Sequence, residues 1–256
     1  MEVEIKQTVK AGNSSAVILP RAWLNKEVRV ELVKKTPDKI LLDVIDLMRK
    51  YIDLKEIMGI YLVGSYAREE ETKDSDIDIL IITKDIDREV IKEGIYSILI
   101  ISRRLLEQKL ENDLFPIGQM LKEAKALINA SYLEELNVKV TKKNIKWYTE
   151  TTKEKLVFIQ RILEKEKKKI DNRTVYTLIL RIRTLYLIQK LVKNQNYSSK
   201  EFIRLITKIS GNSDAYQSYL AIKNDSKKAG ITSRENAKRL YSYLKKQLDD
   251  VKKMVG

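Results

Sequence analysis

Two short groups of residues, ten positions apart, have the types and the spacing that phosphate chemistry requires. Gly64 and Ser65 follow one apolar run, and Asp76 and Asp78 begin the next. A glycine lets the backbone approach a ligand closely and the serine adds a hydroxyl, so the first group is expected to form a cradle for phosphates. Because side chains alternate along a strand, Asp76 and Asp78 share one face, where two carboxylates can bind Mg²⁺.

The residue types that are missing narrow the chemistry further. The chain has no cysteine and no histidine. This composition excludes disulfide frameworks, zinc fingers, thiol nucleophiles, Ser-His-Asp triads and imidazole general bases. Any metal must therefore be a hard cation held by carboxylates, such as Mg²⁺, Mn²⁺ or Ca²⁺. Such an ion lowers the pKa of an attacking hydroxyl and aligns an in-line displacement at phosphorus.

The apolar patterns predict the elements that position these residues. Strands are expected at 57–63, 77–82 and 95–101, with an edge strand at 126–128 and further strands among residues 1–35, including 28–33. Helices are expected near 37–52, 103–111, 115–124, 143–170, 172–194, 198–209, 213–226 and 233–254. The predicted class is α+β, with an N-terminal β-hairpin dimerisation unit (1–35), a small mixed-sheet core (36–139) and an all-α helical bundle (140–256).

Charge is distributed unevenly along the chain. Residues 141–256 hold 28 basic and 11 acidic side chains, whereas residues 36–140 hold 15 basic and 21 acidic ones. An acidic centre beside a basic tail suits a metal-dependent site that accepts a polyanion, although lysine-rich helices that are merely solvated are an equal alternative. No apolar run approaches the roughly 20 residues that span a bilayer, and the N-terminus has neither a signal-peptide nor a transit-peptide pattern, so a cytoplasmic location is expected.

The spacing Gly-Ser, ten residues, Asp-x-Asp resembles the signature of the DNA polymerase beta-like nucleotidyltransferases. The surrounding sequence segments, Ser65-Tyr66-Ala67-Arg68 and Asp74 to Leu80, are similar to those of the minimal nucleotidyltransferases found in prokaryotic toxin–antitoxin pairs. The resemblance covers roughly Val44 to Leu136. It implies a nucleoside triphosphate substrate with Mg²⁺ or Mn²⁺, Asp76 and Asp78 as catalytic metal ligands, and Gly64, Ser65 and Arg68 as nucleotide-binding residues. An Arg68 that instead pairs with Asp74 or Glu71 is equally expected, and Tyr66 is expected to pack.

The chain departs from that family at two positions. Family members carry a third carboxylate on the next strand, where this sequence has Ser97. Serine is neither a general base nor a charged ligand, and Glu93 in the preceding turn is one candidate to replace the carboxylate. Glu69 also replaces the glycine that usually follows Arg68. Metal and nucleotide binding are therefore expected, while turnover is in question.

The N-terminal stretch Val9 to Leu24, with Gly-Asn-Ser and Leu-Pro-Arg, resembles the AbrB/MazE-like swapped-hairpin family of DNA-binding antitoxins and regulators. That resemblance implies a homodimer in which Lys6, Lys10, Arg21 and Arg29 contact DNA phosphates. A dimerisation hairpin without a DNA role is the alternative. The C-terminal bundle stands where relatives carry a substrate-binding or HEPN-like helical domain, but a chain without histidine cannot contain the HEPN nuclease motif.

Taken together, the residues and the resemblance predict a Mg²⁺-dependent nucleotidyltransferase that moves a nucleoside monophosphate to a protein, RNA or small-molecule hydroxyl. The resemblance also implies an antitoxin-like role. The expected partners are a nucleoside triphosphate, DNA through residues 1–35, a toxin protein or RNA acceptor, and a second copy of the chain, with no membrane. The alternative is a non-catalytic DNA-binding regulator or antitoxin with a degenerate nucleotidyltransferase fold. The intact Asp76 and Asp78 pair favours the enzyme, and Ser97 favours the regulator.

Overall fold

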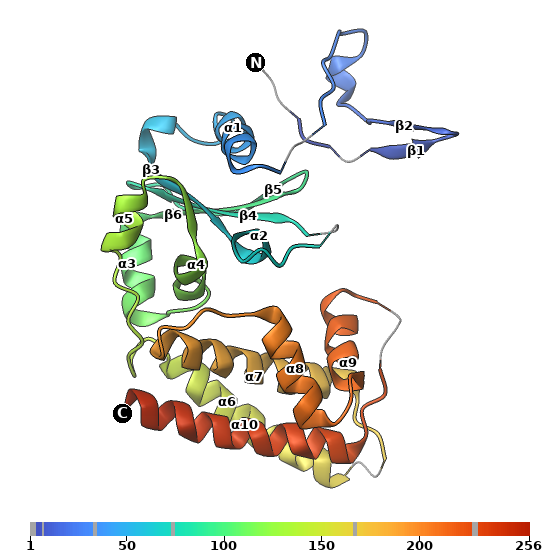
Figure 1. Ribbon diagram of the computed structural model, residues 1–256, viewed down its shortest axis with the longest axis vertical. Coiled ribbons are helices and arrows are strands. Elements are labelled where there is room, and N and C mark those ends of the chain that lie inside the picture. Colours follow the sequence, from blue (N-terminus) through green and yellow to red (C-terminus); the bar gives the residue numbers. More distant parts are fainter. Residues whose placement is uncertain (1–3, 7, 33–34, 73–74, 166–167, 227–229) are drawn as a thin grey trace. The chain divides into compact units, whose positions relative to one another are not determined.

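A computed structural model of the 256-residue chain describes residues 4–6, 8–32, 35–72, 75–165, 168–226 and 230–256. Contacts divide the chain into two compact units, one of Met1–Gln108 with Glu123–Asn137 and one of Lys109–Lys122 with Val138–Gly256. Every strand that the structure describes lies in the first unit, and the second unit is built from helices (Figure 1). The predicted α+β class is confirmed.

The first unit is built on a five-stranded mixed sheet in the order β5-β6-β4-β3-β7. The strands are β3 (Ile57–Val63), β4 (Ile77–Thr83), β5 (Arg88–Glu93), β6 (Tyr96–Ser102) and β7 (Lys125–Ile128). Neighbours pair antiparallel except β4 and β6, which are parallel. The sequence predicted four of these strands, including the edge strand β7, and missed β5, which is mostly charged.

Helix α1 (Pro37–Met48) covers one face of this sheet. Its fully buried residues Val44 and Leu47 pack in one core with Ile79 and Ile98. The buried hydroxyl of Tyr96 also donates a hydrogen bond of 2.8 Å to Asp43 of the helix. Because successive strand residues point to opposite faces, the residues next to Ile79 and Ile98 in β4 and β6 point away from α1.

Four shorter helices lie in the stretch of the chain from Gly64 to Glu135. They are α2 (Gly64–Ala67), α3 (Arg103–Asn112), α4 (Ile117–Glu123) and α5 (Ala130–Glu135). The two helices predicted near 103–111 and 115–124 correspond to α3 and α4. Helix α2 is a single turn, so the chain leaves β3, makes one helical turn and enters the loop that leads to β4.

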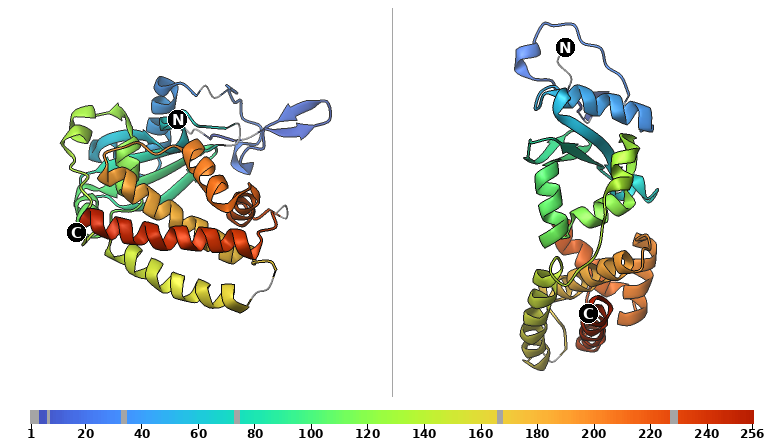
Figure 2. Two further views of the ribbon diagram at one scale, coloured as in Figure 1. Left: turned by 60° about the horizontal axis from the view of Figure 1, so that its bottom comes forward. Right: turned by 90° about the vertical axis from the view of Figure 1, so that its left-hand side faces the viewer.

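The second unit is a bundle of amphipathic helices around α7. Its helices are α6 (Lys146–Lys165), α7 (Asn172–Val192), α8 (Ser199–Ser210), α9 (Asp214–Lys223) and α10 (Arg234–Val255), which confirms the five predicted ones. Helix α7 packs against both α9 and α10 (Figure 2). Its residues Leu178, Ile182 and Leu185 are completely buried. Within the described residues, no helix is both long and apolar enough to cross a membrane.

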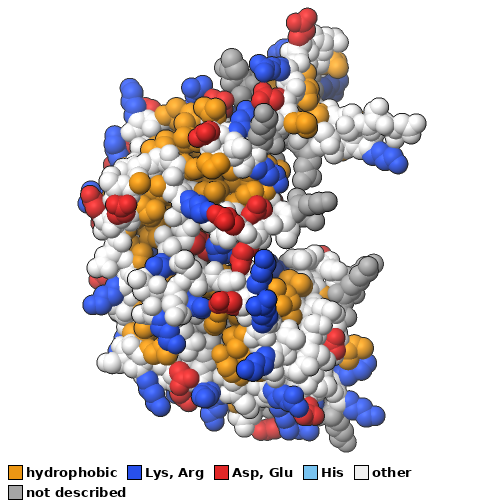
Figure 3. Space-filling model, viewed as in Figure 1, with side chains coloured by type: hydrophobic (Ala, Val, Ile, Leu, Met, Phe, Trp, Pro, Cys, Tyr) orange, Lys and Arg blue, Asp and Glu red, His pale blue; other side chains and the backbone are white. Residues whose placement is uncertain are grey.

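The N-terminal segment forms a small hairpin, β1 (Val9–Ala11) with β2 (Ser14–Ala16), around a turn at Gly12. A 3-10 turn, η1 (Arg21–Trp23), follows. The predicted strand at 28–33 is wrong for the described residues 28–32, which form no strand. The period-two pattern is present there, but a strand also needs a partner, and no described segment of the chain pairs with these residues. Several large apolar side chains of this segment stay exposed (Figure 3): Val9, Ile18, Leu24, Val28, Val30 and Leu32.

Candidate functional site

The carboxylate of Asp78 lies against the backbone of Gly64. Strands β3 and β4 are antiparallel with Val63 opposite Asp78, so Gly64 begins beside that aspartate. The glycine has a positive φ of 71°, and a β-carbon built on it would overlap Oδ2 of Asp78. Both facts require glycine at this position. The sequence pattern thus brings one predicted metal ligand next to one predicted phosphate-binding residue.

Asp76 precedes β4 by one residue and is exposed, whereas Asp78 is half-buried in the strand. The intervening and following residues, Ile77 and Ile79, are 0% and 1% exposed. The hydrogen bond from the Ile77 N–H to the Ile95 carbonyl, 2.7 Å long, starts the pairing with β6 at this point. Strand alternation therefore directs Asp76 and Asp78 to the face that points away from α1.

The residue beside Asp78 on the neighbouring strand is Ser97, because β4 and β6 pair in parallel with these two residues as partners. A hydroxyl thus occupies the position where the family pattern places a third carboxylate. Glu93 does not replace it: this residue is on β5, pairs with Tyr96 and so lies on the α1 face. There it accepts a hydrogen bond from the hydroxyl of Tyr51, which raises the Tyr51 pKa to about 12. The suggested substitution by Glu93 is wrong.

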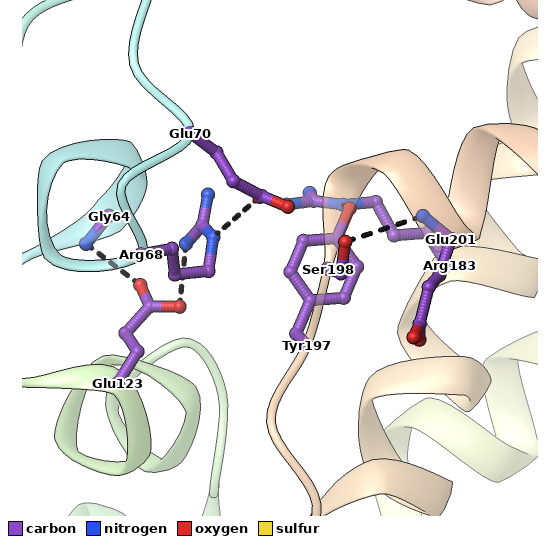
Figure 4. Close-up of polar contacts among 8 residues, drawn as sticks. All are labelled: Gly64, Arg68, Glu70, Glu123, Arg183, Tyr197, Ser198 and Glu201. Carbon is purple, nitrogen blue, oxygen red and sulfur yellow. Dashed lines mark hydrogen bonds and ion pairs between the residues drawn. The ribbon is translucent and has the colours of Figure 1, made fainter.

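Arg68 is held by carboxylates close to the Gly64 turn. Its Nη1 donates to Oε2 of Glu123 at 2.6 Å, and its Nε donates to Oε2 of Glu70 at 3.2 Å. Only 16% of the arginine side chain is exposed. Of the two predicted partners, Glu71 is exposed and Asp74 lies outside the described residues. Arg68 is therefore a mostly buried, paired cation (Figure 4).

Glu123, the last residue of α4, is a site residue that the sequence did not predict. Besides Arg68, its carboxylate binds the backbone N–H of Gly64, which donates to Oε1 at 2.8 Å. Two residues later, Lys125 donates to Glu69 at 2.5 Å, and this contact lowers the pKa of Glu69. The segment 123–125 therefore contacts the turn of residues 64–69 at both ends, through a buried carboxylate at Gly64 and an exposed ion pair at Glu69. Glu123 is 59 positions from Gly64 in the chain, and no local pattern marks it.

Tyr66 is a packing residue, as predicted. Its side chain is buried in the core under α1, and the ammonium group of Lys35 lies 5.3 Å from the centre of its ring. Ser65, one residue earlier, is half-buried. Ser65 thus stays beside the Gly64 turn while its neighbour anchors that turn in the core.

The donor set at this turn fits a Mg²⁺ ion that also binds a substrate. No group of three acidic side chains within the described residues is arranged to hold a metal alone. Mg²⁺ is usually bound through one or two carboxylates, with phosphate oxygens and water filling the other positions. The carboxylates of Asp76 and Asp78 are two hard oxygen donors of the kind that Mg²⁺ prefers, and that of Asp78 lies against the backbone of Gly64.

The four basic residues predicted to contact DNA lie in or near the N-terminal hairpin. Lys10 on β1 and Arg21 in η1 are exposed. Lys6 pairs with Glu4 at 3.3 Å, and Arg29 pairs with Glu31 at 3.6 Å. All four side chains reach solvent, which is compatible with phosphate contacts.

A shallow hollow on the second unit is lined by both basic and apolar side chains. Its lining comes from α10 and the end of α8: Ile209, Glu235, Lys238, Arg239, Ser242, Tyr243 and Lys246. Arg239 pairs with Glu235 at 2.6 Å. Lys238 and Lys246 are exposed and form no ion pair within the described part of the chain. Two lysines on the same side of one helix are therefore available to an anionic ligand.

Comparison with known proteins gives one family match. Residues 45–185, more than half of the chain, match the family described as the nucleotidyltransferase domain. No curated protein matches the sequence significantly.

Three solved structures are similar at a low level. A nucleotidyltransferase-like protein from Exiguobacterium sibiricum has 14% identity and a TM-score of 0.37, with coverage of 85% of this chain and 77% of that one. Spectinomycin adenyltransferase from Enterococcus faecialis, solved with ATP and spectinomycin, has 14% identity and a TM-score of 0.45, covering 82% and 98%. A toxin-antitoxin with AMP-PNP has 20% identity and a TM-score of 0.28, covering 47% and 96%. Because these TM-scores are low, only the family match bears on function.

Proposed function

Because the chain belongs to the nucleotidyltransferase domain family, we propose that it transfers a nucleoside monophosphate from a nucleoside triphosphate to an acceptor hydroxyl and releases pyrophosphate. The observation that supports this proposal most is the position of the Asp78 carboxylate against Gly64. The proposed metal ligand Asp78 and the proposed phosphate-binding backbone of Gly64 then lie next to each other at the same edge of the sheet. In-line displacement needs these two features together.

In this proposal Asp76 and Asp78 hold Mg²⁺ or Mn²⁺, which neutralises charge on the phosphates when it is bound. Gly64 lets the triphosphate approach the backbone, and the Ser65 hydroxyl donates a hydrogen bond to it. Arg68 adds positive charge at the same turn. The Ser97 hydroxyl is not basic enough to take the proton of the acceptor hydroxyl. Without another base, this proton passes to solvent or to a basic group of the acceptor itself. Turnover is then limited by the acidity of the acceptor hydroxyl.

The register of Ser97 with Asp78 also supports a second candidate function. A nucleotidyltransferase fold without a base can bind nucleotide and regulate a partner without turnover. In that case the protein is a non-catalytic DNA-binding regulator or antitoxin. For either function we propose an antitoxin role, which is supported by sequence segments that resemble the toxin–antitoxin nucleotidyltransferases, Ser65 to Arg68 and Asp74 to Leu80. A cytoplasmic location is part of the same proposal.

The N-terminal segment supports the proposal of a homodimer. Ile18, Leu24, Val30 and Leu32 are each more than 70% exposed, which is a large apolar area for one short segment. A second copy that supplies the missing strand partners for residues 28–32 would cover them, as in a swapped hairpin. The exposed Lys10 and Arg21 would then be presented twice, on a surface suited to DNA phosphates. The mass of the protein in solution, with and without residues 1–35, tests the dimer.

For the acceptor we propose RNA, with a protein hydroxyl as the alternative. The lining of the hollow along α10 combines lysines with the ring of Tyr243 and the side chain of Ile209. Proteins that bind single-stranded nucleic acid use the same combination of a basic groove and apolar or aromatic stacking surfaces. Changing Lys238 and Lys246 to alanine should weaken RNA binding and lower the slope of log K against log salt by about 1.4.

The matched control for that experiment changes two basic residues on another exposed helix face, Lys153 and Arg161 of α6. The control removes the same charge from the same bundle, so it should leave the slope unchanged. Equal losses in both variants would mean that RNA binding follows net charge and not the hollow.

Labelled nucleotides test the transferase proposal directly. Purified protein is incubated with Mg²⁺, an RNA pool or cell lysate, and nucleoside triphosphates labelled at either the α- or the γ-phosphate. Nucleotidyl transfer moves the α label to an acceptor and leaves the γ label in pyrophosphate. Changing Asp76 and Asp78 to asparagine should abolish transfer without unfolding the protein. Transfer that survives this double change would locate the active site elsewhere, and nucleotide binding without transfer in the unchanged protein would favour the regulator.

A further inference from the structure

The Glu123 carboxylate occupies the anion-binding groups of the Gly64 turn. One oxygen accepts the Gly64 N–H at 2.8 Å, and the other accepts the Arg68 guanidinium at 2.6 Å (Figure 4). Its side chain is only 8% exposed, so it fits closely between these donors. A backbone N–H and a guanidinium are also typical donors to a phosphate group. The turn therefore has an internal carboxylate in the place where the proposed function puts a phosphate.

The two anions cannot use the Gly64 N–H at the same time. A backbone amide has a single hydrogen, so a good hydrogen bond to Glu123 leaves none for a phosphate oxygen. Two negative groups side by side would also repel each other in a mostly buried site. A triphosphate that binds this turn must therefore displace the Glu123 carboxylate from Gly64, while Arg68 can retain Glu70 as a partner at 3.2 Å.

We propose that Glu123 is a further functional residue of the site: its carboxylate competes with the triphosphate for the Gly64 N–H and Arg68, and so sets the affinity for nucleotide. The inference rests on the proposed function, because it takes Gly64 and Arg68 as phosphate-binding groups. When the Gly64 N–H and Arg68 are free of Glu123 in only a fraction of the molecules, the apparent affinity for the ligand equals the intrinsic affinity multiplied by that fraction. The ligand class is an oligophosphate, whatever base it carries.

Replacing the carboxylate by an uncharged group of the same shape tests the proposal. Glu123→Gln keeps the size of the side chain but weakens its hold on both donors. ATP and inorganic tripolyphosphate, each titrated without added metal by calorimetry, should bind about five- to tenfold more tightly, since a hydrogen bond to a charged group exceeds a neutral one by roughly that factor. Tripolyphosphate separates the phosphate contribution from that of the base.

Glu70→Gln is the matched control. It removes the same charge from the same arginine, but Glu70 does not bind the Gly64 N–H. Its affinity for both ligands should change far less than that of Glu123→Gln, because the contact of Glu123 with the Gly64 N–H stays in place. Glu123→Asp, which keeps the charge but shortens the reach to Gly64, gives a second test if the glutamine variant does not fold, and it should also bind more tightly.

The outcomes are distinguishable. Tighter binding by Glu123→Gln or Glu123→Asp, and not by Glu70→Gln, supports competition. Unchanged or weaker binding by the Glu123 variants overturns it and would make Glu123 a residue that holds the turn in shape. An equal gain in Glu70→Gln also overturns it, because general charge would explain the effect. If none of the proteins binds either ligand, the phosphate site itself is wrong, and the inference falls with the proposed function.

Discussion

Changing Gly64 to alanine should damage both the stability of the first unit and its function, for two separable reasons. The first is the backbone: Gly64 has a φ of +71°, and an L-residue in the left-handed region costs about 1–2 kcal/mol. The second is the overlap of the new β-carbon with Oδ2 of Asp78, which must push the carboxylate away. Overpacking of this kind costs about 1–3 kcal/mol, so the total is roughly 2–5 kcal/mol.

Gly12 provides a control for the backbone contribution. It also has a positive φ, +60°, but a β-carbon there would meet nothing within 4 Å. Gly12→Ala should therefore cost about 1–2 kcal/mol, the conformational share alone. The difference between the two variants measures the contact between Gly64 and Asp78.

The assays are thermal unfolding, followed by circular dichroism, and ATP binding with Mg²⁺. A cost of 1 kcal/mol lowers the Tm of a unit of about 120 residues by roughly 3–6 °C, so Gly64→Ala should unfold clearly below Gly12→Ala. It should also lose ATP binding, whereas Gly12→Ala should keep it. If Gly64→Ala unfolds no earlier than Gly12→Ala and binds ATP normally, the Asp78 carboxylate does not lie against this turn in solution.

Three further predictions concern other parts of the protein. Ser97→Asp places a carboxylate beside Asp78 and should raise the rate of nucleotidyl transfer by about 100-fold or more if a missing base limits it; an unchanged single-turnover rate would count against that limit. The Tyr51 pKa is raised to about 12 by its hydrogen bond to Glu93, so this contact stabilises the fold fully below pH about 10 and is lost as pH rises through 12. Tyr51→Phe should therefore be less stable than the unchanged protein at neutral pH and should lose less stability between pH 10 and 12. If both proteins lose the same stability over this range, the hydrogen bond from Tyr51 to Glu93 is not the cause. Removing residues 1–35 should abolish salt-sensitive binding to duplex DNA in a mobility-shift assay, whereas full retention would place DNA binding in the basic bundle.

The sequence was sufficient for the strand-turn-strand at the centre of the site. The long apolar runs before Gly64 and after Asp76 specify buried strands, and a two-residue period fixes which side chains share a face. The place of Ser97 was expected from the family resemblance, which puts a third carboxylate on the next strand, and the parallel pairing of β4 with β6 sets Ser97 beside Asp78. The helices of the bundle were predictable from the three- and four-residue spacing of their apolar positions.

The features that the sequence missed depend on contacts between distant segments. Glu123 reaches Gly64 across 59 positions, and nothing in its neighbours distinguishes it from other helix-end glutamates. Strand β5 was missed because its residues Arg88–Glu93 are mostly charged, and it forms by pairing with β6 at the edge of the sheet. The opposite error occurred at 28–32, where an alternating pattern finds no partner among the described residues. Local patterns determine which segments can be strands, and the availability of a partner decides which of them are.

The most direct test of the whole account is a crystal structure of the protein with Mn²⁺ and a non-hydrolysable ATP analogue. The account predicts an anomalous-scattering peak bound by the carboxylates of Asp76 and Asp78 at about 2.0–2.2 Å, as expected for a small divalent ion with oxygen ligands. The triphosphate should lie at the turn of Gly64 and Ser65. A nucleotide bound elsewhere, or a metal that does not contact Asp78, would contradict the account.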